Sequence, residues 1–206
     1  NSSHRLTSPS TFPRTAIVTT AEQPTSLDEL RRRFRAGWRP KFLFFWNHEK
    51  SGQPGAVDAG CFSQWYPAPF EVGGVRYATA EHYMMASKAR LFGDAEAERQ
   101  VLASPHPAAA KRLGRTVRGF SEEVWVAHRR GIVEAGSVAK FGQHPVLRDY
   151  LIGTKKRVLV EASPTDRVWG IGLAEDDEHA TNPLEWRGLN LLGFALMTAR
   201  LRLEGG

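Results

Sequence analysis

The chain has 206 residues, of which 41% are hydrophobic and 24% charged, so one sizeable hydrophobic core is expected and a disordered or collagen-like chain is excluded. The formal net charge of +6 predicts attraction to phosphate groups of a nucleic acid or a phosphorylated metabolite, although solvated arginine-rich helices would explain it equally well. A single cysteine, Cys61, excludes an internal disulfide and, with no recognisable signal peptide or membrane-length apolar run, predicts a cytoplasmic protein without membrane association.

The first 40 residues divide into two segments. Residues 1–25 mix Ser, Thr and Pro without a period, which predicts a flexible N-terminal arm. Residues 26–40 form a basic helical lead-in, with Ser26 as N-cap, Glu29 completing a capping box and Gly37 ending the helix. Five arginines of this lead-in could contact a nucleic-acid backbone, although a solvated helix face is the favoured interpretation. They are Arg31, Arg32, Arg33, Arg35 and Arg39.

Residues 41–206 are predicted to form the folded domain, and it opens with β-structure. The aromatic run 41–46 is typical of a buried strand, and the segment 47–60, with its Gly, Pro and Ser residues, predicts a surface loop. An extended, proline-containing segment at 62–70 leads into a β-hairpin at 70–77, because a Gly-Gly pair separates two apolar stretches.

Helical patterns dominate the rest of the chain. The predicted helices are 79–91, 95–102, 107–113, 121–141, 146–152 and 189–203, and the predicted strands are 157–161 and 168–173. With no internal repeat, the sequence predicts an α+β fold: a single, mostly helical domain with a small β-sheet.

Candidate catalytic groups occur on the helix that begins near Thr79. Glu81 and Lys88 are seven residues apart, about 700° of rotation, so both side chains point from one helix face. The alternative for Glu81 is plain helix stabilisation, because a carboxylate near a helix N-terminus is favoured by about 0.3–1 kcal/mol. No paired histidine accompanies His82, so we expect no metal site.

Ordinary nucleophile and phosphate-loop motifs are absent from the sequence. There is no GxSxG or GxxxxGK[ST] pattern, and Cys61 has no catalytic signature around it. Gly170 and Gly172 would allow backbone amides to approach a phosphate, but a tight bend explains them equally well. The residues alone therefore indicate a basic α+β domain whose chemistry stays open.

Four ordered stretches resemble the NADAR family, also called YbiA-like, over about residues 42–203. They are FSQWYPAPF at 62–70 with AEHYMMASKA at 80–89, AKRLGR at 110–115, EASPTDRVWGIG at 161–172 and WRGLNLLG at 186–193. Gln64 and the Met84–Met85 pair depart from the family pattern. We expect these departures to affect substrate preference more than activity. The resemblance implies a YbiA-like fold for residues 41–206 and N-glycosidase activity without a cofactor or a metal.

The resemblance also implies roles for individual residues. Glu81 and Asp166 match catalytic carboxylates, and Trp125 matches a tryptophan that stacks on the substrate. Lys88 is expected in the same pocket, where it would form a Schiff base with the opened ribose, pair with Glu81 or bind phosphate. The further expected substrate-binding residues are Arg115, Arg112, Trp169, Gly170, Asn190, Phe62 and Tyr83.

These residue types suit the cleavage of a ribosyl C–N bond. Positive charge develops on the ribose, which an ionised carboxylate stabilises most in the transition state. The departing nitrogen needs a proton, which a second carboxyl group of raised pKa can supply. The sequence does not assign these two roles between Glu81 and Asp166.

The substrate expected from the resemblance contains ADP-ribose or ribose phosphate. ADP-ribosylated guanine in DNA or RNA is the leading candidate, and ribosylamino-pyrimidine phosphates of riboflavin synthesis are the alternative. A non-catalytic ADP-ribose or nucleotide sensor is a rival from another class, and a plain DNA-binding domain ranks last. The oligomeric state stays open.

Overall fold

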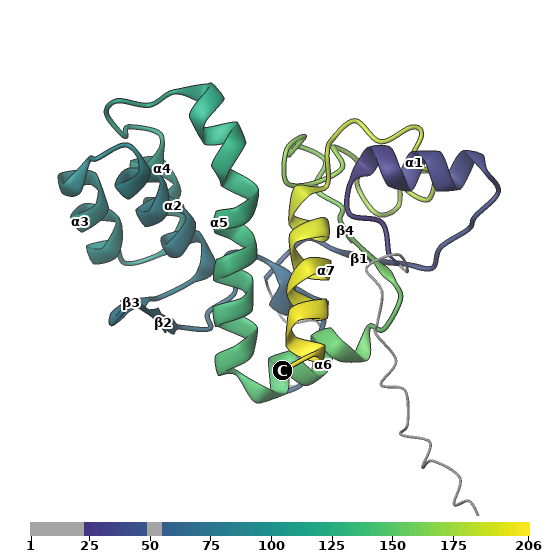
Figure 1. Cartoon of the computed structure of the whole chain (residues 1–206), viewed down its shortest axis with the longest axis horizontal. Coiled ribbons are helices and arrows are strands. Elements are labelled where there is room, and N and C mark those ends of the chain that lie inside the picture. Colours follow the sequence, from purple (N-terminus) through teal and green to yellow (C-terminus); the bar gives the residue numbers. More distant parts are fainter. Residues whose placement is uncertain (1–22, 49–54) are drawn as a thin grey trace, which may run out of the picture.

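The computed structural model describes residues 23–48 and 55–206, which form two groups of helices around a central strand pair (Figure 1). The elements in chain order are α1 (Leu27–Arg35), β1 (Phe42–Phe45), the 3-10 helix η2 (Ala59–Phe62), β2 (Phe70–Val72), β3 (Val75–Tyr77), α2 (Ala80–Leu91), α3 (Ala95–Ala103), α4 (Pro107–Gly114), α5 (Glu122–Gln143), α6 (Pro145–Gly153), β4 (Val158–Glu161) and α7 (Leu191–Glu204). The mixed, mostly helical fold predicted from the sequence is confirmed.

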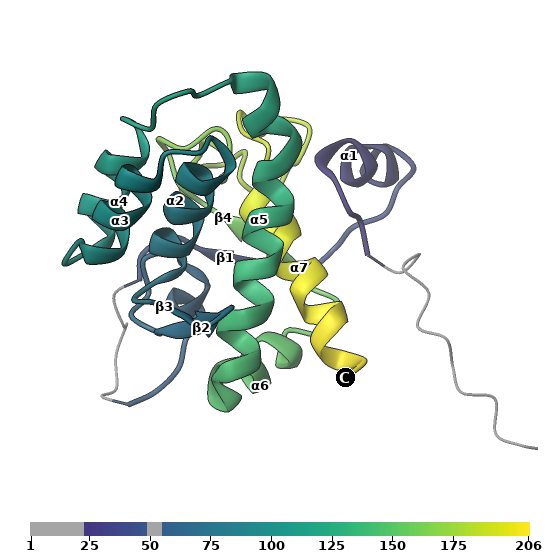
Figure 2. The ribbon, with the colours of Figure 1, turned by 60° about the vertical axis from the view of Figure 1, so that its left-hand side comes forward.

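The longest helix, α5, runs through the middle of the molecule. It lies side by side with α7 on one flank and contacts α2 on the other, where α3 and α4 complete a helical cluster (Figures 1 and 2). Helix α1 lies on the far side of α7, and its buried Leu27 and Leu30 join the main hydrophobic core. None of the described helices is both long and apolar enough to cross a membrane.

The β-structure consists of two separate pairs of strands within the described residues. Strands β1 and β4 are parallel, with Phe42 opposite Val158 and Phe45 opposite Glu161. Strands β2 and β3 form the expected antiparallel hairpin, whose Gly73 and Gly74 adopt positive φ. Helix α7 packs against β4 and so covers part of the parallel pair.

The predicted strand at 168–173 is wrong. The Ile171 N–H donates to the Glu161 carbonyl, and the Ile171 carbonyl accepts from Arg187, but no ladder follows. Gly172 has a φ of +68°, which bends the chain away from an extended path. The tight-bend interpretation of these glycines therefore holds.

Most predicted helix starts are confirmed by their caps. The side chains of Ser26, Thr79, Asp94 and Ser121 each accept a hydrogen bond from the N–H three residues later. The capping box at Glu29 is wrong in one detail, because its carboxylate accepts from the N–H of Thr25 instead of Ser26.

The predicted N-terminal arm falls largely on residues 1–22, which lie outside the described residues. Its end is anchored. The buried Gln23 side chain donates to the Met197 carbonyl and accepts from the Arg200 guanidinium. Arg200 is itself buried and also donates to Thr154. Residues 23–25 therefore belong to the folded body.

A buried asparagine joins the start of α7 to β4. Asn190 lies just before the helix with a φ of +53°, a conformation that asparagine tolerates better than most residues. Its amide donates to the Leu159 carbonyl at 2.9 Å and accepts from the Glu161 N–H at 3.0 Å. One turn on, an added Cβ at Gly193 would lie 2.1 Å from the Leu159 carbonyl oxygen. Asn190 and Gly193 thus allow α7 to approach β4 closely.

Two replacements of Asn190 should separate the contribution of its side-chain hydrogen bonds from that of its left-handed backbone. Asn190→Gly removes both hydrogen bonds and leaves a buried N–H and C=O unpaired, which we expect to cost about 1–3 kcal/mol of unfolding free energy. Asn190→Ala should lose about 1–2 kcal/mol more, because alanine resists the left-handed conformation. Urea denaturation followed by circular dichroism measures both.

The matched control is Asn182→Ala, which removes one local hydrogen bond to the Leu184 N–H. It should change the unfolding free energy by less than about 1 kcal/mol, the usual net worth of one exposed hydrogen bond. An Asn190→Ala variant as stable as Asn190→Gly would show that the left-handed backbone is not a constraint.

Candidate active site

A cavity of about 630 Å³ opens where α2, α4 and the start of α5 face the carboxyl ends of β1 and β4. Its size is typical of a small-molecule site. The residues predicted from the sequence that line it are Glu81, Asp166, Lys88, Trp125, Arg115 and Trp169. The fold thus brings both predicted carboxylates, the predicted lysine and the predicted stacking tryptophan to one place.

Five other predicted binding residues do not line this cavity. Phe62 is fully buried and packs on Phe45 and Phe141, and Tyr83 packs on Phe70. These aromatic side chains therefore stabilise the core. Their contact with a substrate stays a prediction.

The remaining three lie near the cavity without lining it. The Arg112 side chain is exposed on α4, and Asn190 supports β4. Gly170 is packed so closely that an added Cβ would lie 2.8 Å from the Glu161 carbonyl oxygen and 3.1 Å from that of Asp166. Gly170 and Asn190 therefore hold the backbone that carries the carboxylates, and substrate contact by these three residues also stays a prediction.

Glu81 is held in the first turn of α2 with only 4% exposure. Its N–H donates to the Gln64 carbonyl at 2.9 Å, and its carboxyl group accepts a hydrogen bond from the Trp65 side chain. Burial raises the pKa of Glu81 to about 7, with a further contribution from the charge of Asp166 and an opposing one from Lys111. The Glu81 carboxyl group can therefore exchange a proton near neutral pH.

Glu161, at the end of β4, was missed by sequence reasoning. It lines the cavity, and its Oε2 atom is buried without a hydrogen-bond partner among the described residues. Burial, with the charges of Asp166 and Glu81, raises the pKa of Glu161 to about 8. A useful signal was its position, since side chains at the carboxyl ends of parallel strands often line binding sites.

Asp166 lies in the loop after β4 and is oriented by the backbone. Its Oδ1 accepts from the N–H groups of Val168 at 2.8 Å and Trp169 at 2.7 Å. The Asp166 N–H in turn donates to the Ser163 hydroxyl. These three local bonds fix the carboxylate on the cavity wall beside Glu81 and Glu161.

Lys88 lies between two aromatic rings. Its ammonium is 4.5 Å from the centre of the Phe120 ring and 5.4 Å from that of Trp125, within the range of cation–π attraction. Burial lowers the pKa of Lys88, while the neighbouring Glu122 opposes this shift. The lowered pKa is compatible with the predicted Schiff base, and that role stays a prediction.

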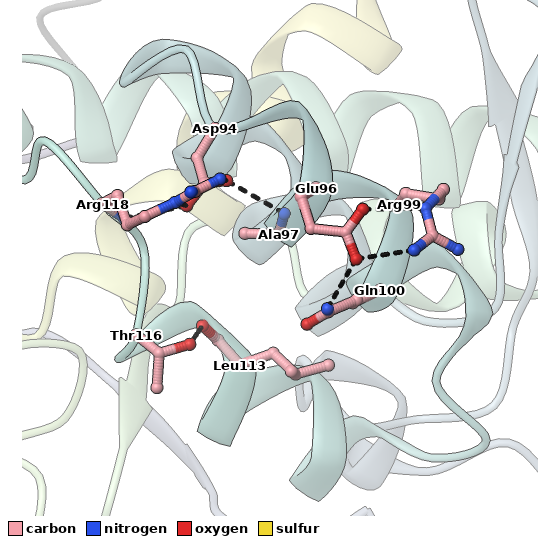
Figure 3. A network of polar contacts seen from close by, with 8 residues as sticks. All are labelled: Asp94, Glu96, Ala97, Arg99, Gln100, Leu113, Thr116 and Arg118. Atoms are coloured by element: carbon pink, nitrogen blue, oxygen red, sulfur yellow. Dashed lines mark hydrogen bonds and ion pairs between the residues drawn. The ribbon is translucent and has the colours of Figure 1, made fainter.

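The loop that carries Arg115 and Phe120 is fixed by Asp94, the N-cap of α3 (Figure 3). The Asp94 carboxylate accepts from the Arg118 N–H at 2.9 Å and from its guanidinium at 2.9 and 3.2 Å. These bonds hold the pKa of Asp94 well below its usual range. The same aspartate thus starts α3 and positions the mouth of the cavity.

The segment that carries Trp65 is held in place by a buried lysine on α5. Lys140 is 1% exposed and donates to the carbonyls of Cys61 at 2.7 Å and Ser63 at 3.0 Å. Burial lowers the pKa of Lys140 to about 8. Sequence reasoning missed both Lys140 and the cavity-lining Trp65, because nothing in their spacing marks them.

Further cations and aromatic groups complete the cavity wall. Lys111 lies 6.0 Å from the centre of the Trp65 ring, and Arg129 lines the cavity one helical turn beyond Trp125. Trp46 follows β1 and is 47% exposed at the rim. Among the described residues, no group of three or more His, Cys, Asp and Glu side chains is arranged to hold a metal ion. The site combines three carboxyl groups, aromatic faces and several cations.

Comparison with known proteins decides the family. The NADAR domain model matches residues 44–204. The chain belongs to the NADAR family. It is 39% identical to an N-glycosidase of Acanthamoeba polyphaga mimivirus, across 78% of this chain and 95% of the relative. It is 32% identical to N-glycosidase YbiA of Escherichia coli, across 71% of this chain and 82% of that protein.

The fold agrees with the family. The NMR structure of the E. coli protein YbiA superimposes with a TM-score of 0.63 and 27% identity, covering 88% of this chain and 94% of that one. The YbiA-like fold predicted from the sequence is therefore confirmed. The predicted enzyme class, a hydrolase of N-glycosyl compounds, agrees with these NADAR relatives.

Glu81→Gln should stabilise this NADAR domain at slightly alkaline pH. The folded pKa of Glu81 lies above the ordinary value of 4.5, so folding opposes its ionisation and wild-type stability falls as pH rises from about 4.5 to about 7. The neutral amide avoids this cost. We expect a melting temperature higher than wild type at pH 8, by about 2–4 °C for each kcal/mol relieved.

The gain should shrink towards pH 4.5, where wild-type Glu81 is protonated in the folded state and about half protonated in the unfolded state. Differential scanning calorimetry at pH 4.5, 6, 7 and 8 provides the measurement, and the exposed Glu123→Gln is the control. If Glu81→Gln is no more stable than wild type at pH 8, the surroundings of Glu81 do not oppose its ionisation.

Proposed function

We propose that this N-glycosidase removes ADP-ribose from guanine bases by hydrolysing the bond between ribose C1 and the base nitrogen. The observation that carries the proposal is the convergence of Glu81, Glu161 and Asp166 on one wall of a cavity whose other walls are aromatic and cationic. The pKa of Glu81 is raised close to neutrality, as proton transfer at neutral pH requires.

The chemistry divides between Glu81 and Asp166. As the C1–N bond breaks, its electron pair passes to the base nitrogen, which takes a proton from Glu81. Asp166, oriented by two backbone N–H groups, faces the positive charge that develops on the ribose. A water oxygen then bonds to C1, and the proton that this water loses returns to Glu81.

The rest of the cavity suits the substrate. The face of Trp125 offers a stacking surface for the guanine base, a contact of about 1–3 kcal/mol. Lys88, Arg115 and Arg129 line the same cavity and suit the two phosphates of ADP-ribose, since cations with several N–H groups recognise phosphate oxygens. The base would be presented by ADP-ribosylated DNA or RNA.

Two alternatives share this cavity. A ribosylamino-pyrimidine phosphate would use the same carboxyl groups but offers one phosphate to the cations. A non-catalytic ADP-ribose sensor would need the cations and the tryptophan, yet it has no use for an acid such as Glu81 that can exchange a proton near neutral pH. Glu81, with Asp166 beside it, therefore favours catalysis over sensing.

The decisive experiment incubates the protein with an oligonucleotide containing ADP-ribosylated guanine and follows the products by mass spectrometry. Wild type should release ADP-ribose and restore guanine. Glu81→Gln keeps the shape of the side chain but cannot deliver a proton, so we expect the rate to fall by about 10²–10⁴-fold. Glu123→Gln, exposed on the first turn of α5, should keep the wild-type rate.

Other results would redirect the assignment. Release only from a ribosylamino-pyrimidine phosphate would replace the substrate and keep the chemistry. Tight calorimetric binding of ADP-ribose without release would establish the sensor. Equal rates for wild type and Glu81→Gln would remove Glu81 from the proton-transfer step.

A further inference from the structure

Glu161 has a buried oxygen that no described residue pairs with. The two neighbouring acids have hydrogen-bond donors within the protein. Glu81 accepts from the Trp65 side chain, and Asp166 accepts from two backbone N–H groups. The Glu161 Oε2 atom has no such partner among the described residues, although it is sealed from solvent and its residue lines the cavity. An unpaired buried polar atom costs about 1–3 kcal/mol, which suggests that a ligand completes it.

Both backbone polar groups of Glu161 are hydrogen-bonded. Its N–H donates to Asn190 at 3.0 Å, and its carbonyl accepts from Ile171 at 2.9 Å. An added Cβ at Gly170 would lie 2.8 Å from the same carbonyl oxygen, so the backbone of Gly170 packs closely on the strand end. The fold thus holds this carboxyl group in place at the cavity wall.

The charges around Glu161 favour its neutral form. Burial makes the largest contribution to the raised pKa of Glu161. The charges of Asp166, from the loop after β4, and of Glu81, from α2, raise this pKa further, and Lys111 from α4 lowers it. A neutral carboxylic acid has an O–H that donates one hydrogen bond, which an ionised carboxylate lacks. A protonated Glu161, which lines the cavity, can therefore donate a hydrogen bond to a ligand there.

We propose that Glu161 is a substrate-binding residue, which acts as a neutral carboxylic acid and donates a hydrogen bond to an oxygen atom of the ribosyl group. This assignment rests on the proposed function. If Glu81 serves the leaving nitrogen and Asp166 serves C1, the third carboxyl group beside them lies within reach of the ribose hydroxyl oxygens. Glu161 then binds and orients the sugar without taking part in proton transfer.

Calorimetric titration with ADP-ribose between pH 6.5 and 9 tests this role. Wild-type affinity should fall by about tenfold from pH 7 to pH 9 as Glu161 loses its proton. Glu161→Gln keeps a neutral donor at the same place, so its affinity should match wild type at pH 7 and fall much less by pH 9. Glu161→Ala should bind about tenfold more weakly at pH 7.

The comparison isolates Glu161, because Glu81, Asp166 and Lys111 are present in all three proteins. Melting curves confirm that each variant folds. If Glu161→Ala does not fold, the pH profiles of wild type and Glu161→Gln still decide the question.

Three outcomes would overturn the assignment. Equal affinities in all proteins would mean that Glu161 does not touch the ligand. A Glu161→Gln variant as weak as Glu161→Ala at pH 7 would mean that the ionised form accepts a hydrogen bond instead. If wild type binds neither ADP-ribose nor ribose 5-phosphate, the proposed function falls together with this role, whereas the first two outcomes leave the function standing.

Discussion

The burial of neighbouring carboxyl groups, to which their mutual repulsion adds, is the constraint on which this site depends. Glu81 and Glu161 are placed out of water beside Asp166, and Lys111 offsets only part of the accumulated negative charge. Burial and repulsion act in the same direction on both glutamates, so the cluster retains protons that isolated carboxyl groups would release at neutral pH. Such a site opposes folding, and the surrounding structure must compensate for it.

The compensation comes from backbone geometry. Asn190 bonds to the Leu159 carbonyl and to the Glu161 N–H of β4, and Gly193 allows α7 to approach the Leu159 carbonyl. At Gly188, an added Cβ would lie 2.2 Å from the Gly170 carbonyl oxygen, so the loops that frame the acids are packed backbone against backbone. The acids are therefore held by segments with little freedom to move, which keeps their mutual distances fixed while their charges change.

The sequence predicted the helices well because their caps are local. Ser26, Thr79 and Ser121 bond to N–H groups three residues away, so the chain itself marks these boundaries. Glu81, Asp166 and Trp125 were reached through a family resemblance. Glu161 and Lys140 could not be recognised in this way, because their significance depends on burial and on partners about 80 residues away. The false strand at 168–173 arose because alternation cannot reveal the positive φ of Gly172.

The contact of Lys88 with Phe120 and Trp125 has a consequence for how affinities should be understood. The two aromatic faces are already in contact with a cation from the same chain. A base that stacks on Trp125 must therefore exchange one attractive contact for another, and measured binding reports the difference between the two. If a base displaces Lys88 in this way, the ammonium becomes available to a phosphate, and under the proposed function base stacking and phosphate binding would then be coupled.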